Sequence, residues 1–286
     1  MKHFLRDSIV VFATVLFLFI LPVEWLGTKV KNETAYKRDY MQQHAEEIKT
    51  LLLGNSLFEV SFNPHALGDS VFMSAQVARG IYYDFRIAEK TIPQMKNLRT
   101  VLFPIYIGDL RVGGESVVDG VEYSKVWRIS CRNFPNSILC QSLLISGRFS
   151  KNYFCNTSGC DSLGYLRIND KWNGQGGKVP PRGNFNERNE YAEMLSRLAH
   201  LCHENGVRFI SVTCPLTNKY LSQCTPGYYE DLGWIVATVQ EQYPMEFCDY
   251  TQDAAFREDT LYYDINHLNH TGATLFAQRV KQDFGL

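Results

Sequence analysis

Three residues of this chain have the types and the spacing needed for a proton relay. Ser56 follows the apolar run 51–53 and the turn-forming pair 54–55, where a hydroxyl and a backbone N–H can both face a crevice. Asp264 and His267 lie three positions apart, so the carboxylate can hold one imidazole nitrogen while the other stays free as a base. These side chains would supply a nucleophile and its base.

Each of these segments also has an ordinary structural explanation. Gly-Asn-Ser is a common turn, serine is a common helix cap, and an aspartate three positions before a histidine occurs by chance in many loops. Asp264, His267 and His270 could instead form a metal cluster, because histidines three apart on a helix face the same way. A polar cap at the start of the last helix explains His270 more simply, and we therefore predict no metal and no cofactor.

Strand-like and helix-like segments alternate along the chain, and they must position these residues. Short apolar runs predict strands at 51–53, 70–73, 99–107, 207–213 and 245–249, and helices are predicted at 32–50, 75–92, 187–205, 228–242 and 271–284. This alternation predicts an α/β fold of the flavodoxin-like kind, a three-layer α/β/α sandwich with a mainly parallel sheet, over residues 32–286. Reactive groups in such folds gather at the carboxyl ends of the strands, which is where Ser56 lies.

The stretch from Arg111 to Arg188 interrupts the alternation. It is rich in Gly, Asn and Ser, and a structureless loop of that length is improbable, so we predict an insertion with its own short strands and turns. Four of the eight cysteines lie in it. The candidate disulfides are Cys155 with Cys160, Cys131 with Cys140 and, outside the insertion, Cys214 with Cys224; free buried thiols are equally compatible with the sequence.

The N-terminal segment is strongly apolar. Residues 4–26 are long enough to span a bilayer, which takes about 20 mainly apolar residues. Lys2 and Arg6 precede the apolar run at 9–23 within this segment, which predicts a cytoplasmic N-terminus and export of the rest of the chain. A cleaved signal peptide and a buried core helix are alternatives, but no small-x-small cleavage site follows. We expect residues 1–31 to be an uncleaved signal-anchor that holds the domain outside the cytoplasm.

The overall composition excludes some classes of protein. The chain has 286 residues, 45% of them hydrophobic and 21% charged, without a low-complexity tract, as in a folded protein. The formal net charge of −1 argues against a broad surface for nucleic acid. No CxxC pair occurs, so the sequence lacks the main signal of a zinc ribbon or a thioredoxin-type protein.

Two motifs together carry a family resemblance. With Gly-Asn-Ser at 54–56 and Asp-Ile-Asn-His-Leu-Asn-His-Thr-Gly-Ala at 264–273, the chain resembles the SGNH/GDSL hydrolase superfamily. Within it, the chain is similar to the membrane-anchored bacterial branch whose members O-acetylate alginate and other envelope glycans. The resemblance covers about residues 51–284, excluding much of the insertion.

The resemblance implies a role for each motif residue. Ser56 would be the nucleophile that attacks an ester carbonyl, His267 the general base, and Asp264 the group that orients the imidazole. The Ser56 backbone N–H would be one oxyanion donor. Family members add a glycine and an asparagine from later loops, and the sequence does not match them there; Ser74 and Asn218 are the substitutes that it offers.

The implied function is an exported esterase or O-acyltransferase that acts on acyl, chiefly acetyl, esters of an envelope or extracellular glycan. Transfer would need an acyl donor from the cytoplasmic side and hence a multi-pass membrane partner, whereas hydrolysis would need none. The incomplete oxyanion set leaves a second interpretation open, a catalytically silent glycan-binding or assembly subunit on the same fold.

Overall fold

The structure is a computed structural model, and it describes residues 2–106, 108, 110, 112, 117–132, 142–144 and 159–286. The chain divides into two compact units, Met1–Arg38 with Gly114–Ser158, and Asp39–Gly113 with Gly159–Leu286. This division differs from the expected one. Part of the predicted insertion belongs with the N-terminal segment, and residues 159–188 belong with the α/β unit.

Among the described residues, five parallel strands form one sheet in the α/β unit. They are β1 Thr50–Leu52, β2 Val71–Met73, β3 Thr100–Pro104, β4 Arg208–Thr213 and β5 Glu246–Asp249, in the order β2-β1-β3-β4-β5. Strands β2 and β3 are buried along their whole length, as expected for parallel strands with helices on both faces. The sheet confirms the predicted α/β fold.

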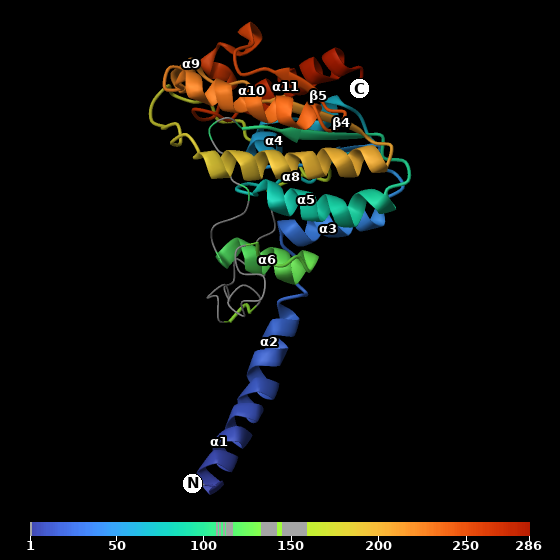
Figure 1. Ribbon diagram of the computed structural model, residues 1–286, viewed down its shortest axis with the longest axis vertical. Helices are drawn as coiled ribbons and strands as arrows, with labels where there is room; N and C mark the ends of the chain where they lie inside the picture. Colours follow the sequence, from blue (N-terminus) through green and yellow to red (C-terminus); the bar gives the residue numbers. More distant parts are fainter. Residues whose placement is uncertain are drawn as a thin grey trace. The chain divides into compact units, whose positions relative to one another are not determined.

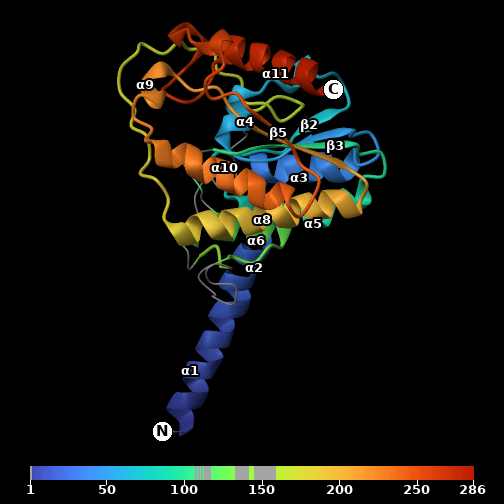
Figure 2. The same ribbon diagram turned by 45° about the horizontal axis from the view of Figure 1, so that its top comes forward.

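Helices cover both faces of this sheet (Figures 1 and 2). On one face α8 packs between α5 and α10, and on the other α4 packs against α11. Their bounds are α4 Ser56–Ser61, α5 Ile81–Thr91, α8 Phe185–Glu204, α10 Pro226–Gln240 and α11 His270–Phe284; the other described helices of this unit are α9 Asn218–Leu221, η2 Pro64–Ala66, η3 Ile92–Gln94, η5 Ala254–Phe256 and η6 Asp259–Leu261. Helix α3, Glu33–Gln43, ends in this unit, where Tyr40 stacks on Phe72 of β2.

The strand order reverses direction at the first strand. The chain runs from β1 outward to β2 and then crosses to β3 on the other side of β1. Ligand sites of open α/β sheets form at such a reversal, outside the carboxyl ends of the two strands that flank it. Helix α5 starts six residues later than position 75, because residues 74–80 form a loop whose first N–H groups donate to Leu52 and Gly54 carbonyls.

An ion-pair cluster joins the segment before α8 to helix α10. Arg182 donates to both carboxylate oxygens of Asp231 at 2.6 and 2.8 Å, and Arg188 donates to the same carboxylate at 3.0 Å. The hydrogen bond from Arg182 lowers the pKa of Asp231 below its ordinary value, and it outweighs the opposing effect of burial. The carboxylate is therefore charged in the folded protein at neutral pH.

Asp231→Asn should lower the free energy of unfolding by about 1–2 kcal/mol at neutral pH, because three charge-assisted hydrogen bonds lose their acceptor charge. The folded-state pKa is depressed, so this stabilisation is present above the ordinary value of 3.8 and is lost as the pH falls below it. Urea unfolding of both proteins should therefore converge at acidic pH. Glu230→Gln, at the exposed neighbouring position, should change stability by less than about 0.5 kcal/mol. An equal deficit for Asp231→Asn at both pH values would contradict the electrostatic cause.

The N-terminal unit contains one long apolar helix. Its segments α1 Lys2–Val15, η1 Leu16–Ile20 and α2 Leu21–Leu26 run on without a break. In the described part of the chain it is the one helix long and apolar enough to cross a membrane, by length and composition. None of its residues is buried, which rules out the alternative of a core helix. A membrane anchor and a signal sequence both have these properties.

Part of the predicted insertion folds against the end of this helix. It contributes α6, Val117–Trp127, whereas only short strands and turns were expected there. The interior glycine and the valines of α6 are weak helix formers, so the helix depends on burial of Val121, Val126 and Trp127 rather than on propensity. Lys125 of α6 forms an ion pair with Glu24 at 2.5 Å.

The structure describes both members of one of the three suggested cysteine pairings. Cys140 and Cys155 lie outside the described residues, so the two pairings that involve them stay predictions. Cys214 and Cys224 are both free, and the third suggested pairing is therefore wrong. Cys214 is instead buried under α4, where its Sγ lies 3.6 Å from the Leu57 carbonyl oxygen.

Candidate active site

Ser56, His267 and Asp264 come together at the carboxyl end of β1. The Ser56 Oγ lies 2.8 Å from the Nε2 atom of His267. The other ring nitrogen, Nδ1, lies 3.0 and 2.9 Å from the two carboxylate oxygens of Asp264. A hydroxyl within hydrogen-bond reach of a base, and a base oriented by a carboxylate, is the arrangement that activates a serine as a nucleophile.

Ser56 is positioned by the turn that joins β1 to α4. Asn55 caps the helix, because its side-chain oxygen accepts the Leu57 N–H at 3.0 Å. Ser56 is the first residue of α4 and remains half-exposed. Within the described part of the chain, its backbone N–H has no hydrogen-bond partner. The Ser56 hydroxyl and N–H are therefore both available to a bound carbonyl.

Asp264 and His267 are held by a short turn ahead of α11. The backbone N–H groups of Asn266 and His267 donate to Asp264 Oδ1 at 2.9 and 2.8 Å. The next N–H, that of Leu268, donates to the Ser61 Oγ at 2.9 Å. Because Ser61 ends the helix that Ser56 begins, this bond fixes the histidine loop to the nucleophile helix.

The site is partly shielded from water, and its carboxylate is ionised. The side chains of His267 and Asp264 are 15% and 33% exposed. Burial acts to raise the pKa of Asp264, but hydrogen bonds from the His267 ring and from two backbone N–H groups outweigh it and lower the pKa below its ordinary value. The charged carboxylate can hold a proton on Nδ1, which leaves Nε2 to accept the proton of Ser56.

The two other predicted oxyanion donors are engaged elsewhere. The backbone N–H of Ser74 donates to the Leu52 carbonyl at 2.8 Å, and its fully buried side chain lies against Arg79. Asn218 is exposed and its side-chain oxygen accepts from Arg257 at 3.0 Å. No described contact directs either side chain to Ser56. Their role in catalysis stays a prediction, and the Ser56 N–H is the donor that the geometry supports.

The two histidines of the alternative metal site have different hydrogen-bond partners. His270 directs its Nδ1 to the Tyr165 hydroxyl at 3.2 Å, while His267 is engaged by Asp264 and Ser56. Among the described residues, no group of three His, Cys, Asp or Glu side chains is placed to hold a metal ion.

A buried ion pair that the sequence analysis missed lies beneath the nucleophile turn. Asp84 of α5 accepts the Gly54 N–H at 3.0 Å and pairs with Arg79 at 3.2 Å. Arg79 also donates to the Ser74 carbonyl at 2.6 Å, and both charged side chains are at most 1% exposed. The pair thus links the loops after β1 and β2 from below. An aspartate within a predicted helix gives no signal of such a role.

Gly54→Ala should disrupt the turn that presents Ser56. Gly54 has a φ of +120°, and a Cβ there would lie 2.5 Å from Pro104 Cδ. Gly68 offers a matched control, because it has the same φ of +120° but nothing within 4 Å of its Cβ position. Backbone strain should cost each variant about 1–3 kcal/mol of folding stability. Any hydrolysis of p-nitrophenyl acetate that depends on Ser56 should fall at least about tenfold further in Gly54→Ala, since misplaced reacting groups lose rate steeply. Equal turnover in the two variants would contradict this role of Gly54.

Comparison by sequence finds no matching family model and no matching curated protein. Similar solved structures include a GDSL-like lipase from Bacteroides thetaiotaomicron, with 11% identity, coverage of 88% of this chain and 98% of that chain, and a TM-score of 0.46. A catalytic mutant of an acetylxylan esterase from Geobacillus stearothermophilus is also similar, with 12% identity, coverage of 84% and 94%, and a TM-score of 0.45. At such low identity, the chemistry of the site must be argued from its own residues.

Proposed function

We propose that this protein is a serine esterase or O-acyltransferase of the SGNH/GDSL type. One observation carries the proposal: Ser56 Oγ lies 2.8 Å from His267 Nε2, while Asp264 holds the opposite ring nitrogen at 2.9 Å. The two motifs that contain these residues lie at the ends of the α/β unit, in the order typical of that superfamily. The flavodoxin-like strand order supports the same interpretation.

The geometry accounts for acyl transfer in two half-reactions. Ser56 Oγ bonds to the ester carbonyl carbon while His267 Nε2 takes its proton, and the Ser56 N–H donates to the oxyanion that forms. The bond to the alcohol then breaks, and His267 returns the proton to the leaving oxygen, which leaves an acyl-serine. A water molecule or an acceptor hydroxyl attacks next, again deprotonated by His267. Its proton passes from His267 to Ser56 Oγ as the acyl group departs.

We further propose that the domain is tethered to a membrane and exported. Lys2 and Arg6 in the first turns of the apolar helix favour a cytoplasmic N-terminus. Residues that follow the apolar run are hydrogen-bonded to the insertion, since Glu24 accepts from Ser142 at 2.6 Å and Asn32 donates to Glu122 at 2.9 Å. Cleavage near this point would remove part of a folded unit, which favours an anchor over a removed signal peptide.

The substrate class follows from the family resemblance. We propose an O-acyl, chiefly O-acetyl, ester of an envelope or extracellular glycan. Hydrolysis needs only the triad and water. Transfer to a glycan would also need an acyl donor from a multi-pass membrane partner. The alternative of a catalytically silent binding subunit is supported by the incomplete set of oxyanion donors. The described contacts of the Ser74 and Asn218 side chains are with Arg79 and Arg257, not with the site. Loss of one oxyanion donor can cost about 10²–10³ in rate.

Activity of the full-length chain in detergent tests the proposal directly. It should hydrolyse p-nitrophenyl acetate, release acetate from an acetylated oligosaccharide and react with a fluorophosphonate at Ser56. Preincubation with the fluorophosphonate should abolish both activities. The absence of turnover together with the absence of Ser56 labelling in the folded protein would overturn the esterase and favour the silent subunit.

A further inference from the structure

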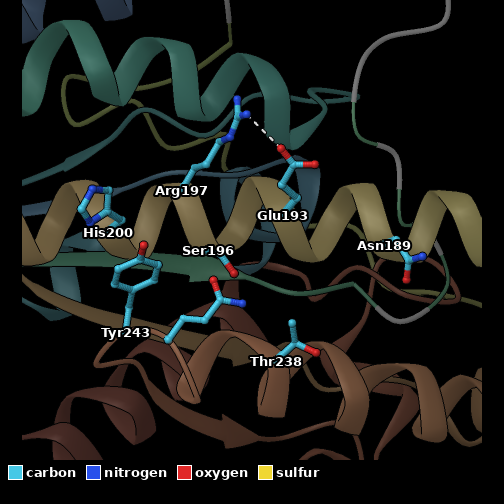
Figure 3. A pocket seen from close by; sticks show the side chains of 8 residues that line it. Asn189, Glu193, Ser196, Arg197, His200, Thr238 and Tyr243 are labelled. Atoms are coloured by element: carbon cyan, nitrogen blue, oxygen red, sulfur yellow. Dashed lines mark ion pairs between the residues drawn. The ribbon is translucent and has the colours of Figure 1, made fainter.

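A groove between helices α8 and α10 has no part in the proposed chemistry. It has a volume of about 260 Å³, close to the lower end of small-molecule sites at about 300 Å³. Figure 3 shows Ser196 and His200 along α8, facing Thr238 of α10 and Tyr243 just beyond its end. Every one of its eight lining side chains carries a hydrogen-bonding group.

Three polar atoms of this groove are buried without a protein partner. Ser196 Oγ, Asn189 Oδ1 and His200 Nδ1 form no hydrogen bond with any described residue. Ser196 is only 6% exposed. A serine inside a helix often bonds back to a carbonyl one turn earlier, as the Thr238 hydroxyl does to the Trp234 carbonyl across the groove. Because buried polar groups are normally paired, these three atoms indicate a polar occupant.

The hydrogen-bonding character of these atoms defines that occupant. Asn189 presents a carbonyl oxygen, which is an acceptor. The Nε2 atom of His200 lies 3.3 Å from a Glu204 carboxylate oxygen, and the ring Nδ1 is able to accept or to donate according to the protonation of the ring. Ser196 can donate or accept. The groove therefore suits a ligand with several hydroxyl groups, because a hydroxyl can both donate and accept.

The charges of the groove are balanced. Glu193 and Arg197 form an ion pair with each other at 2.9 Å, so neither carboxylate nor guanidinium attracts an opposite charge alone (Figure 3). The Tyr243 ring packs against His200 with ring centroids 4.8 Å apart. This aromatic wall beside polar atoms can cover the apolar face of a sugar ring.

We propose that this groove binds one residue of a neutral glycan. The inference goes beyond the proposed esterase, because none of the groove residues touches Ser56, Asp264 or His267 through a described contact. It rests on three buried polar atoms without a described protein partner, a charge-balanced lining and an aromatic wall. If the esterase acts on a glycan, the groove would give the polymer a second hold on the protein.

Binding should be measured on full-length Ser56→Ala protein in detergent, so that turnover plays no part. The probes are the neutral hexaoses of glucose, xylose and mannose, with an oligogalacturonate as the acidic probe and spermine as the cationic one. Isothermal titration should give a Kd of about 1 mM or below for at least one neutral hexaose, and weaker binding of the two charged probes. No binding of any neutral hexaose, or preference for a charged probe, would overturn the proposal.

Variants then locate the binding site. Ser196→Ala and Tyr243→Ala should each weaken binding of the hexaose about tenfold, while Phe185→Ala, an aromatic at the exposed start of α8, should leave it unchanged. All three variants in the wild-type background should keep fluorophosphonate labelling of Ser56, which separates the groove from the triad. Full affinity in both groove variants would place the glycan elsewhere and refute this site, whether or not the esterase is active.

Discussion

Ser56→Ala should reduce hydrolysis of p-nitrophenyl acetate by about 10⁴-fold or more, because no acyl-enzyme can form without the hydroxyl. The Ser56 hydroxyl is partnered by His267, and the capping bond from Leu57 to Asn55 does not involve it. The variant should therefore fold with a thermal midpoint close to that of the parent. Steady-state kinetics should show the loss of hydrolysis, and fluorophosphonate labelling of the same preparation should show the loss of the reactive hydroxyl.

The matched control is another hydroxyl on a helical turn. The Ser222 Oγ donates to the Lys219 carbonyl at 2.9 Å, and no hydrogen bond among the described residues joins it to a base. Ser222→Ala should keep the parent turnover and the parent labelling. Turnover by Ser56→Ala within about tenfold of the parent would mean that another group performs the attack.

The core of the α/β unit could be predicted from local sequence patterns. The apolar runs at 70–73 and 207–213 became β2 and β4, and the apolar stripe at 271–284 became α11 within one residue of its predicted start. Periodicity is a local property, so it survives without knowledge of the tertiary contacts. The Asp264 and His267 pairing is local in the same sense, because a three-residue turn holds both side chains.

The unpredicted features depend on contacts between distant segments. Helix α6 is stable only where its apolar side can be buried, and the sequence of the insertion does not show what covers it. The bonds from Gly54 to Asp84 and from Leu268 to Ser61 join residues 30 and 207 positions apart. Neither leaves a spacing pattern that a single sequence can reveal.

The oxyanion predictions depend on side-chain directions that a sequence does not show. The loop after the strand at 207–213, which is β4, does reach the elements of the site. Cys214 Sγ lies 3.6 Å from the Leu57 carbonyl oxygen, and the Thr217 hydroxyl donates to the Ile265 carbonyl at 2.7 Å. The side chain of Asn218, the next residue, instead accepts from Arg257. Spacing in a single sequence does not show which residue of such a loop faces the nucleophile.

Asp264→Asn should lower kcat by about 10⁴-fold while the turn around it persists. The amide oxygen of asparagine can still accept the Asn266 and His267 N–H groups, which donate to Asp264 Oδ1 at 2.9 and 2.8 Å. It cannot balance the charge of an imidazolium, and its NH₂ group can stabilise the wrong tautomer of His267. The expected result is thus a loss of rate without a comparable loss of stability.

Asp264→Ala supplies the comparison that separates charge from structure. It removes the acceptor of both backbone N–H groups as well as the charge. It should therefore match Asp264→Asn in kcat, but its free energy of unfolding, measured with urea, should be lower by about 1–3 kcal/mol. Because the pKa of Asp264 is lowered in the folded protein, the carboxylate stays charged through the neutral and mildly acidic range, and its contribution is lost only as the pH falls through that depressed value. Parent turnover should therefore show no ionisation of Asp264 between about pH 5 and pH 8. Near-parent kcat in Asp264→Asn would show that the carboxylate charge is not needed and that its bonds to the turn are its whole role.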